Sequence, residues 1–100
     1  MNDIQKIIYW SAKEATGLWD IISEICNKRN VSRISAVDLL KNEIDFIINN
    51  NEIFLLQSNK LYDNNAISNI DKNIILILDY SAFNFRENGI FYYLSDTLSV

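Results

Sequence analysis

The stretch IQKIIYWSAKEATGLWDIISEIC, residues 4–26, decides the fold of this chain. Wound at the helical repeat of about 100° per residue, its apolar side chains share one face and its polar side chains gather on the other, which predicts amphipathic helix. We therefore expect Trp19 and Ile22 to be buried together. The apolar face consists of Ile4, Ile7, Ile8, Ala12, Ala15, Leu18, Trp19, Ile22, Ile25 and Cys26.

Thr16-Gly17 interrupts this pattern without changing its phase. Either one helix tolerates Gly17 or two helices abut there, and the sequence leaves both readings open. Trp10 and Ile21 fall on a flank of the apolar stripe and widen it. A helix with so wide a stripe is expected to pack against neighbours on more than one side. Cys26 is the only cysteine, and we expect it to be a small buried hydrophobic residue.

A second helix is predicted over residues 35–49, after a polar loop at 27–34. Ser35 followed by Asp38 is a variant of the capping box that starts helices. Asn49-Asn50-Asn51 is expected to end the helix, because asparagine tolerates the left-handed conformation. Leu39 and Phe46 project from the side opposite to its core stripe. That stripe consists of Val37, Leu40, Ile44, Ile47 and Ile48.

Two strands are predicted in the second half, at residues 52–57 and 90–94, the latter after a turn at Asn88-Gly89. The five aliphatic residues at 74–78 fit a buried strand or a buried helix, and we favour a helix over 69–82. The expected fold class is α+β and winged-helix-like. A long N-terminal helical segment and a second helix would pack on a small antiparallel sheet in a single domain, 1–100.

Catalytic chemistry is not expected of this chain. It has no histidine, a single cysteine and only two glycines, far apart, so neither a His-based nucleophile nor a glycine-rich phosphate loop can be built. The carboxylate pairs Asp20/Glu24 and Glu43/Asp45 are expected to lie on solvated helix faces. We therefore predict no enzyme, no catalytic residue, no metal and no cofactor.

The N-terminus lacks a signal-peptide layout and no apolar run is long enough to span a membrane, so a cytoplasmic location is expected.

The charge of the chain constrains its partner. With 9 basic and 13 acidic residues the net charge is −4, and the pI is about 4.6. Phosphate backbones are bound by surplus lysine and arginine, so nucleic acid is a poor expected partner and a basic protein is a better one. Residues 1–50 carry 6 basic and 7 acidic side chains, whereas residues 51–100 carry 3 and 6. The candidate binding residues are therefore Asp63, Asp71, Asp79 and Glu87.

Two other interpretations of the surface stay open. The acidic residues of the second half could be ordinary solubilising charges. In that case three apolar side chains that fit the core poorly become the next candidates, since tryptophan and other large apolar groups often anchor interfaces. These are Trp10, Leu39 and Phe46.

The order of several segments resembles a known group of proteins. Residues 8–12 and 16–22 come first, a helix like 36–44 runs into a strand at 53–56, and residues 89–97 close the chain. This order resembles the small bacterial proteins with a winged-helix-like core that accompany polymorphic toxins, including immunity proteins of contact-dependent growth inhibition. The resemblance implies binding and inhibition of one cognate toxin, often a basic nuclease. It supplies no contact residues.

A different function class remains as the alternative. A winged-helix DNA-binding regulator would use the 35–49 helix for recognition. That helix carries Lys41 against Asp38, Glu43 and Asp45, and a net acidic helix is ill-suited to a groove lined with phosphates. A purely structural subunit is the third possibility.

Overall fold

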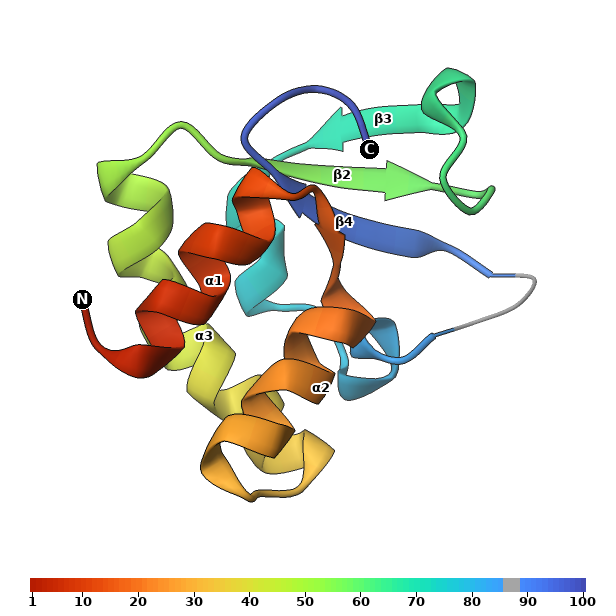
Figure 1. Ribbon diagram of the computed structural model, residues 1–100. Helices are drawn as coiled ribbons and strands as arrows, with labels where there is room; N and C mark the ends of the chain where they lie inside the picture. The colour runs from red at the N-terminus through yellow and green to blue at the C-terminus, as the bar shows by residue number, and fades with distance from the viewer. Residues whose placement is uncertain (86–88) are drawn as a thin grey trace.

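The structure is a computed structural model of residues 1–100, and it describes all of them except 86–88. Three α-helices pack on a four-stranded antiparallel sheet, which confirms the α+β class (Figure 1). The helices are α1 (Asp3–Lys13), α2 (Leu18–Arg29) and α3 (Arg33–Asn50). The strands are β1 (Thr16–Gly17), β2 (Phe54–Ser58), β3 (Ile67–Ile70) and β4 (Phe91–Ser95), and the 3-10 helices are η1 (Asn64–Ala66), η2 (Lys72–Leu76) and η3 (Tyr80–Phe83).

The N-terminal apolar stripe forms two helices, α1 and α2, joined by the short strand β1. The break lies at Ala15, whose φ of 52° is left-handed and turns the chain out of α1. Asn2 and Gln5 start α1 with a capping box in which each side chain accepts a bond from the other residue's backbone N–H. Trp19 and Ile22 are both buried, but in different apolar clusters, so the prediction that they are buried together was only half right.

Helix α3 begins two residues earlier than predicted. Ser32 is its N-cap, and the Ser32 side chain accepts a bond from the Ser35 backbone N–H. The proposed capping box of Ser35 and Asp38 is therefore wrong, and the predicted 27–34 loop shrinks to a short connection because α2 continues to Arg29. Asn51 ends α3 in an extended conformation, while the left-handed asparagine is Asn30, at the end of α2. The predicted core stripe of α3 is buried as expected.

The sheet has the strand order β1-β4-β2-β3, with every neighbouring pair antiparallel. β4 is central and pairs with β2 along its whole length, from Phe91 opposite Ser58 to Ser95 opposite Phe54. β1 pairs with β4 only at Leu94 and Tyr93. The predicted strands are thus present, with bounds shifted by one or two residues.

The predicted helix over 69–82 is wrong. Its first residues belong to β3, which pairs with β2, and the remainder forms η2 and η3. The side chains of Asp71 and Asp79 accept bonds from backbone N–H groups two residues on, which starts a tight turn at each site. Within the aliphatic run only Ile75 is fully buried, and Ile77 is 81% exposed, so the run matches neither a buried helix nor a buried strand.

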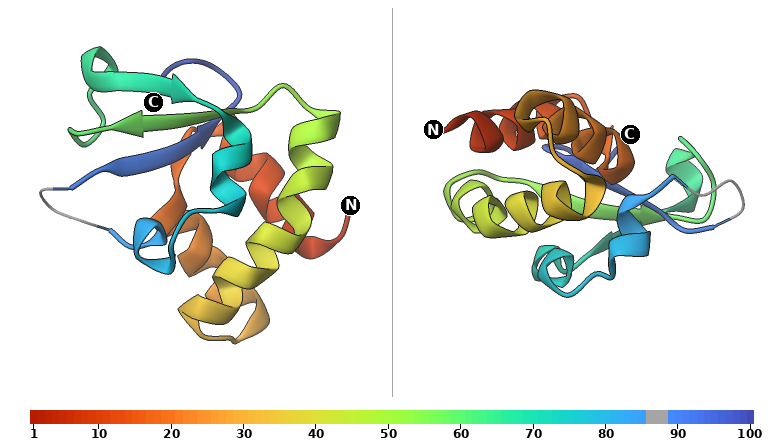
Figure 2. Two further views of the ribbon diagram at one scale, coloured as in Figure 1. Left: turned by 180° about the vertical axis from the view of Figure 1, so that it is seen from behind. Right: turned by 90° about the horizontal axis from the view of Figure 1, so that it is seen from below.

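The sheet buries apolar side chains on both faces. Leu55 and Leu94 point into the main core, which the three helices share. Leu56, Phe91 and Tyr93 point to the other face and pack with Trp19 into a second cluster. Figure 2 shows α1 and α2 on one side of α3, with the η2 and η3 segments on its other side. Helix α3 is therefore packed from two sides.

A cationic side chain ties the helices to the η3 segment. The Arg33 guanidinium donates to Ser23 Oγ (2.9 Å) and Trp19 O (3.3 Å) on α2, and to Phe83 O (3.0 Å) and Asn84 Oδ1 (3.1 Å). These neutral acceptors come from two segments far apart in the chain. Arg33 thus acts as a structural link between them.

Candidate functional site

The predicted binding carboxylates have local structural roles. Asp63, Asp71 and Asp79 are the N-caps of η1, η2 and η3, and their Oδ1 atoms accept bonds from backbone N–H groups at 2.9, 3.0 and 3.4 Å. Glu87 lies outside the described residues. β3 lies between Asp63 and Asp71 in the chain, and η2 between Asp71 and Asp79. The three described carboxylates therefore follow one another along the chain, each with its own backbone partner.

Most described basic side chains contact groups of the chain itself. Lys41 Nζ donates to Leu78 O at 2.6 Å and lies over the rings of Tyr80 and Phe83, at 5.7 and 5.6 Å from their centroids. Lys72 Nζ donates to Ile48 O at 3.1 Å. Both lysines thereby hold the η2–η3 segment against α3. Their charges are partly neutralised by carbonyl dipoles and aromatic faces.

The exposed end of α2 is linked to α1 by an ion pair. Arg29 donates to both carboxylate oxygens of Asp3, at 2.6 and 2.7 Å. The hydrogen bond from Arg29 is the main cause that lowers the pKa of Asp3 to about 2. Because the folded-state pKa is depressed, this pair stabilises the fold above the unfolded pKa near 3.8 and loses that effect as the pH falls toward 2.

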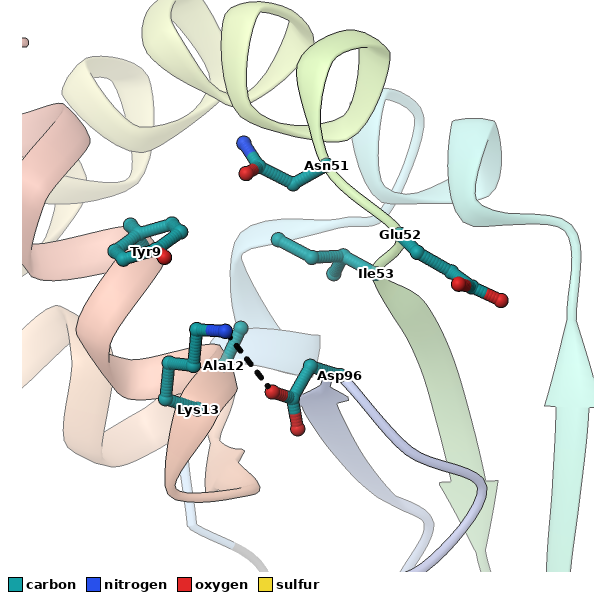
Figure 3. A pocket seen from close by; sticks show the side chains of 7 residues that line it. All are labelled: Tyr9, Ala12, Lys13, Asn51, Glu52, Ile53 and Asp96. Atoms are coloured by element: carbon teal, nitrogen blue, oxygen red, sulfur yellow. Dashed lines mark ion pairs between the residues drawn. The ribbon is translucent and has the colours of Figure 1, made fainter.

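A hollow of about 220 Å³ lies where α1, the α3–β2 connection and the end of β4 meet (Figure 3). Its residues come from three parts of the sequence that the fold brings together. Figure 3 shows the Tyr9 ring and the Lys13 ammonium on the α1 side, with the Asp96 carboxylate next to Lys13 and the Asn51 amide on the α3 side; the Glu52 side chain extends away from them. The lining residues are Tyr9, Ala12, Lys13, Asn51, Glu52, Ile53 and Asp96.

Lys13 is the cation of this hollow. Its Nζ lies 3.4 Å from Asp96 Oδ2 and 5.2 Å from the centroid of the Tyr9 ring. The hydrogen bond to Asp96 is the main cause that raises the pKa of Lys13, so the ammonium stays charged. The Asp96 backbone N–H donates to Ala12 O at 3.0 Å, which fixes the end of β4 against α1.

Two further polar residues, Asn51 and Glu52, line the hollow. The Asn51 amide Nδ2 donates to Ile47 O at 3.1 Å, which orients the side-chain carbonyl. Among the described residues, no hydrogen bond or ion pair reaches the Glu52 carboxylate. The charged groups that meet at the hollow are Lys13 and Asp96, because the Glu52 side chain extends away from both (Figure 3).

The three apolar candidates for an interface differ in exposure. Trp10 is 61% exposed and packs edge-to-face on Tyr9, with ring centroids 5.3 Å apart, so it lies beside the hollow. Phe46 is 46% exposed on α3. Leu39 is half-buried against the main core. Trp10 therefore combines exposure with a neighbouring hollow, as interface anchors often do.

Sequence reasoning missed this hollow. In the sequence, Glu52 and Asp96 count only as members of an acidic excess, and Lys13 and Tyr9 lie 39 or more positions from them. The one available signal is that Asn51, Glu52 and Asp96 directly follow helix or strand residues, where binding groups are often displayed. That signal is shared by many other polar residues of the chain.

Two findings concern metal ions and membranes. Within the part of the chain that the structure describes, no three His, Cys, Asp or Glu side chains are grouped so as to hold a metal ion. Of the helices among residues 1–85 and 89–100, none has both the length and the apolar character needed to cross a bilayer.

Comparison with protein-family models, curated proteins and solved structures gives no match for this chain.

Proposed function

We propose that this protein is an immunity protein that binds and neutralises a basic toxin domain by protein–protein contact. The observation that carries the proposal is that the basic and the acidic side chains have different surroundings. Five of the eight basic side chains among the described residues contact groups of the chain, whereas many acidic side chains face solvent. Such a surface attracts a basic protein and repels phosphate backbones.

The contacts of the basic side chains support this argument. Lys13 and Arg29 are in ion pairs, and Arg33, Lys41 and Lys72 donate to acceptors of the chain. Lys6 and Lys28 are exposed and line one hollow together with Asp3 and Glu24, so the two lysines lie in a mixed surface that also holds carboxylates. A phosphate-binding surface needs clustered, available cations. The described residues offer no such cluster.

The regulator alternative is disfavoured by the surroundings of α3. Asp38 accepts a bond from the Tyr80 hydroxyl at 3.0 Å, and Lys41 donates to Leu78, so residues 78–80 lie against this part of the helix. A recognition helix needs one face free to enter the major groove. Beyond the first turn of α3, none of the exposed side chains is basic. They are Asp38, Asn42, Asp45, Phe46, Asn49 and Asn50.

Co-expression tests the proposal. Bacterial cells that produce the cognate basic toxin domain are expected to grow when they also produce the chain, because binding blocks the toxin. A fluorescence anisotropy titration with duplex DNA near physiological salt should show no appreciable binding. Failure to protect, together with sub-micromolar and sequence-selective DNA binding, would replace the immunity function by the regulator function.

A further inference from the structure

We infer that the outer edge of β3 (Ile67–Ile70) binds an extended segment of a partner protein as an additional strand of the sheet. The basic character of that segment rests on the proposed function, in which the partner is a basic toxin domain. Both the contact surface, an edge of the sheet, and the extended conformation of its occupant go beyond that function.

The backbone of β3 is open on one side. β3 is the last strand of the sheet and pairs only with β2. In an antiparallel pair, every second residue points its N–H and C=O groups away from the neighbouring strand. Within residues 1–85 and 89–100, no hydrogen bond reaches the backbone of residues 67–70 apart from the pairing with β2. Figures 1 and 2 show β3 outermost in the sheet, with none of the three α-helices beyond it, so alternate donors and acceptors are available to another strand.

β3 lacks features that usually keep an exposed edge from pairing. Proteins protect such edges with prolines, charged side chains or bulges. The four residues are Ile67, Ser68, Asn69 and Ile70, so none is charged or a proline, and their register with β2 continues without a bulge. At the opposite edge, β1 is only two residues long and is followed directly by α2. Of the two edges, β3 is therefore the one that can accept a strand.

The two faces of β3 each offer apolar surface to an added strand. Ile67 is half-buried against the second cluster, and Ile70 is half-buried against the main core. Ser68 and Asn69 between them are exposed. Strand addition takes its affinity from main-chain hydrogen bonds and its specificity from alternate side chains. A bound strand would extend the apolar packing on both faces, beside Ile67 on one and beside Ile70 on the other.

Two carboxylates near the ends of β3 favour a basic occupant. Asp71 follows the last residue of β3 directly, and Asp63 is the N-cap of η1, the turn that leads into the strand. Each uses Oδ1 for its cap hydrogen bond, and no ion pair in the described part of the chain includes either. Lys72 is turned toward α3, where Nζ donates to Ile48 O, and Lys60 lies at the β2 end of the loop. A strand with a cation near each end would therefore meet a carboxylate at each end.

A second copy of the chain fits this edge less well. Two copies joined at β3 would bring the same carboxylates of both copies close together, and like charges repel. Four paired residues also bury far less than the roughly 1,200 Å² at which stable interfaces begin. A basic segment that belongs to a larger interface has neither disadvantage.

An extended basic peptide added to the full chain tests the inference. Acetyl-Lys-Val-Thr-Val-Thr-Lys-amide is titrated while the backbone amide signals are followed by NMR. We expect millimolar binding, with shifts concentrated at residues 66–71 and slower hydrogen exchange of alternate β3 amides. The control is the same peptide N-methylated at its four central residues, which keeps the charges and side chains but cannot pair as a strand. Equal binding of both peptides, or shifts confined to other elements, would overturn the inference.

Proline variants remove a backbone donor without changing charge. Ser68 and Asn69 are neighbours, so one points its N–H toward β2 and the other points it outward. Of Ser68→Pro and Asn69→Pro, the variant that loses the outward N–H should keep the denaturation midpoint and bind the peptide about fivefold more weakly, as the loss of one hydrogen bond does. Unchanged affinity in the stable variant would contradict the inference. If neither variant folds, the comparison with the N-methylated peptide decides.

A charge variant tests the basic character of the occupant. Asp63→Asn combined with Asp71→Asn keeps both caps and should weaken peptide binding by about two- to fivefold. Asp20→Asn combined with Asp45→Asn removes the same charge from exposed helix positions and should leave binding unchanged. Equal weakening by both would mean that bulk charge attracts the peptide, and the basic occupant of this edge would be refuted. A dimer of the chain alone in analytical ultracentrifugation, lost in the stable proline variant, would assign the edge to a second copy instead.

The peptide experiment needs no toxin, so its outcome is separate from that of the co-expression experiment. Strand binding without protection of cells would remove the toxin role and leave the site. Protection without strand binding would leave the toxin role and remove this site.

Discussion

Replacing Gly17 with alanine is expected to destabilise the fold by about 3 kcal/mol, at the upper end of the usual range for overpacked cores. Gly17 has φ −64° and ψ 145°, which alanine adopts readily, so the expected cost is steric. A Cβ atom there would lie 2.4–2.6 Å from three ring carbons of Trp19. Chemical denaturation followed by circular dichroism measures the loss.

The Trp19 ring has little room to move away. It lies on the sheet face above Gly17 and meets the rings of Phe85, Phe91 and Tyr93 at centroid distances of 5.3, 5.8 and 5.4 Å. The matched control is Gly17→Ala in a Trp19→Leu background, where the flat ring is gone. The cost of Gly17→Ala should fall sharply there, as a double-mutant cycle reports. Equal costs in both backgrounds would show that the clash is not the cause.

Replacing Ile22 with alanine is expected to cost about 2–5 kcal/mol, as large-to-small changes in a packed core do. Ile22 is fully buried in the main core, among side chains from all three helices. Ile77→Ala makes the same chemical change at a residue that is 81% exposed, and it should cost less than about 0.5 kcal/mol. Urea denaturation of both variants gives the comparison. A loss at Ile22 as small as that at Ile77 would contradict the assigned core.

The N-terminal half of the fold could be predicted from the sequence because its signals are local. The apolar stripe of residues 4–26 and the core stripe of α3 both follow the helical repeat. The break between α1 and α2 was undecided because the phase of the stripe continues through it. What ends α1 is the left-handed backbone of Ala15, and alanine carries no sequence signal for that conformation.

The strands predicted at 52–57 and 90–94 are present, but the structure of residues 69–82 depends on long-range contacts, and there the prediction failed. Residues 67–70 form a strand because they pair with β2. The local sequence pattern of these residues does not predict that pairing. The aliphatic run at 74–78 then packs as a 3-10 turn. The hollow was missed for the same reason, since Lys13 and Asp96 meet only when α1 and β4 are assembled.

Three of the predicted binding carboxylates are also N-caps, so a variant that removes their charge must keep the capping hydrogen bonds. Asparagine caps turns about as well as aspartate, so changing Asp63, Asp71 and Asp79 together to asparagine removes three charges and should leave η1, η2 and η3 intact. A matched variant removes three exposed carboxylates from the helices. It carries Asp20→Asn, Glu24→Gln and Asp45→Asn.

The rate of association with the basic toxin domain, measured against salt concentration, tests the central claim most directly. Electrostatic attraction raises association rates and weakens as salt screens it, so the rate should fall steeply with salt. The Asp63/Asp71/Asp79 variant should associate roughly three- to tenfold more slowly at low salt, with a shallower salt dependence than the matched variant. A wild-type rate that does not change with salt would contradict the claim that the acidic surface of this chain recruits a basic protein.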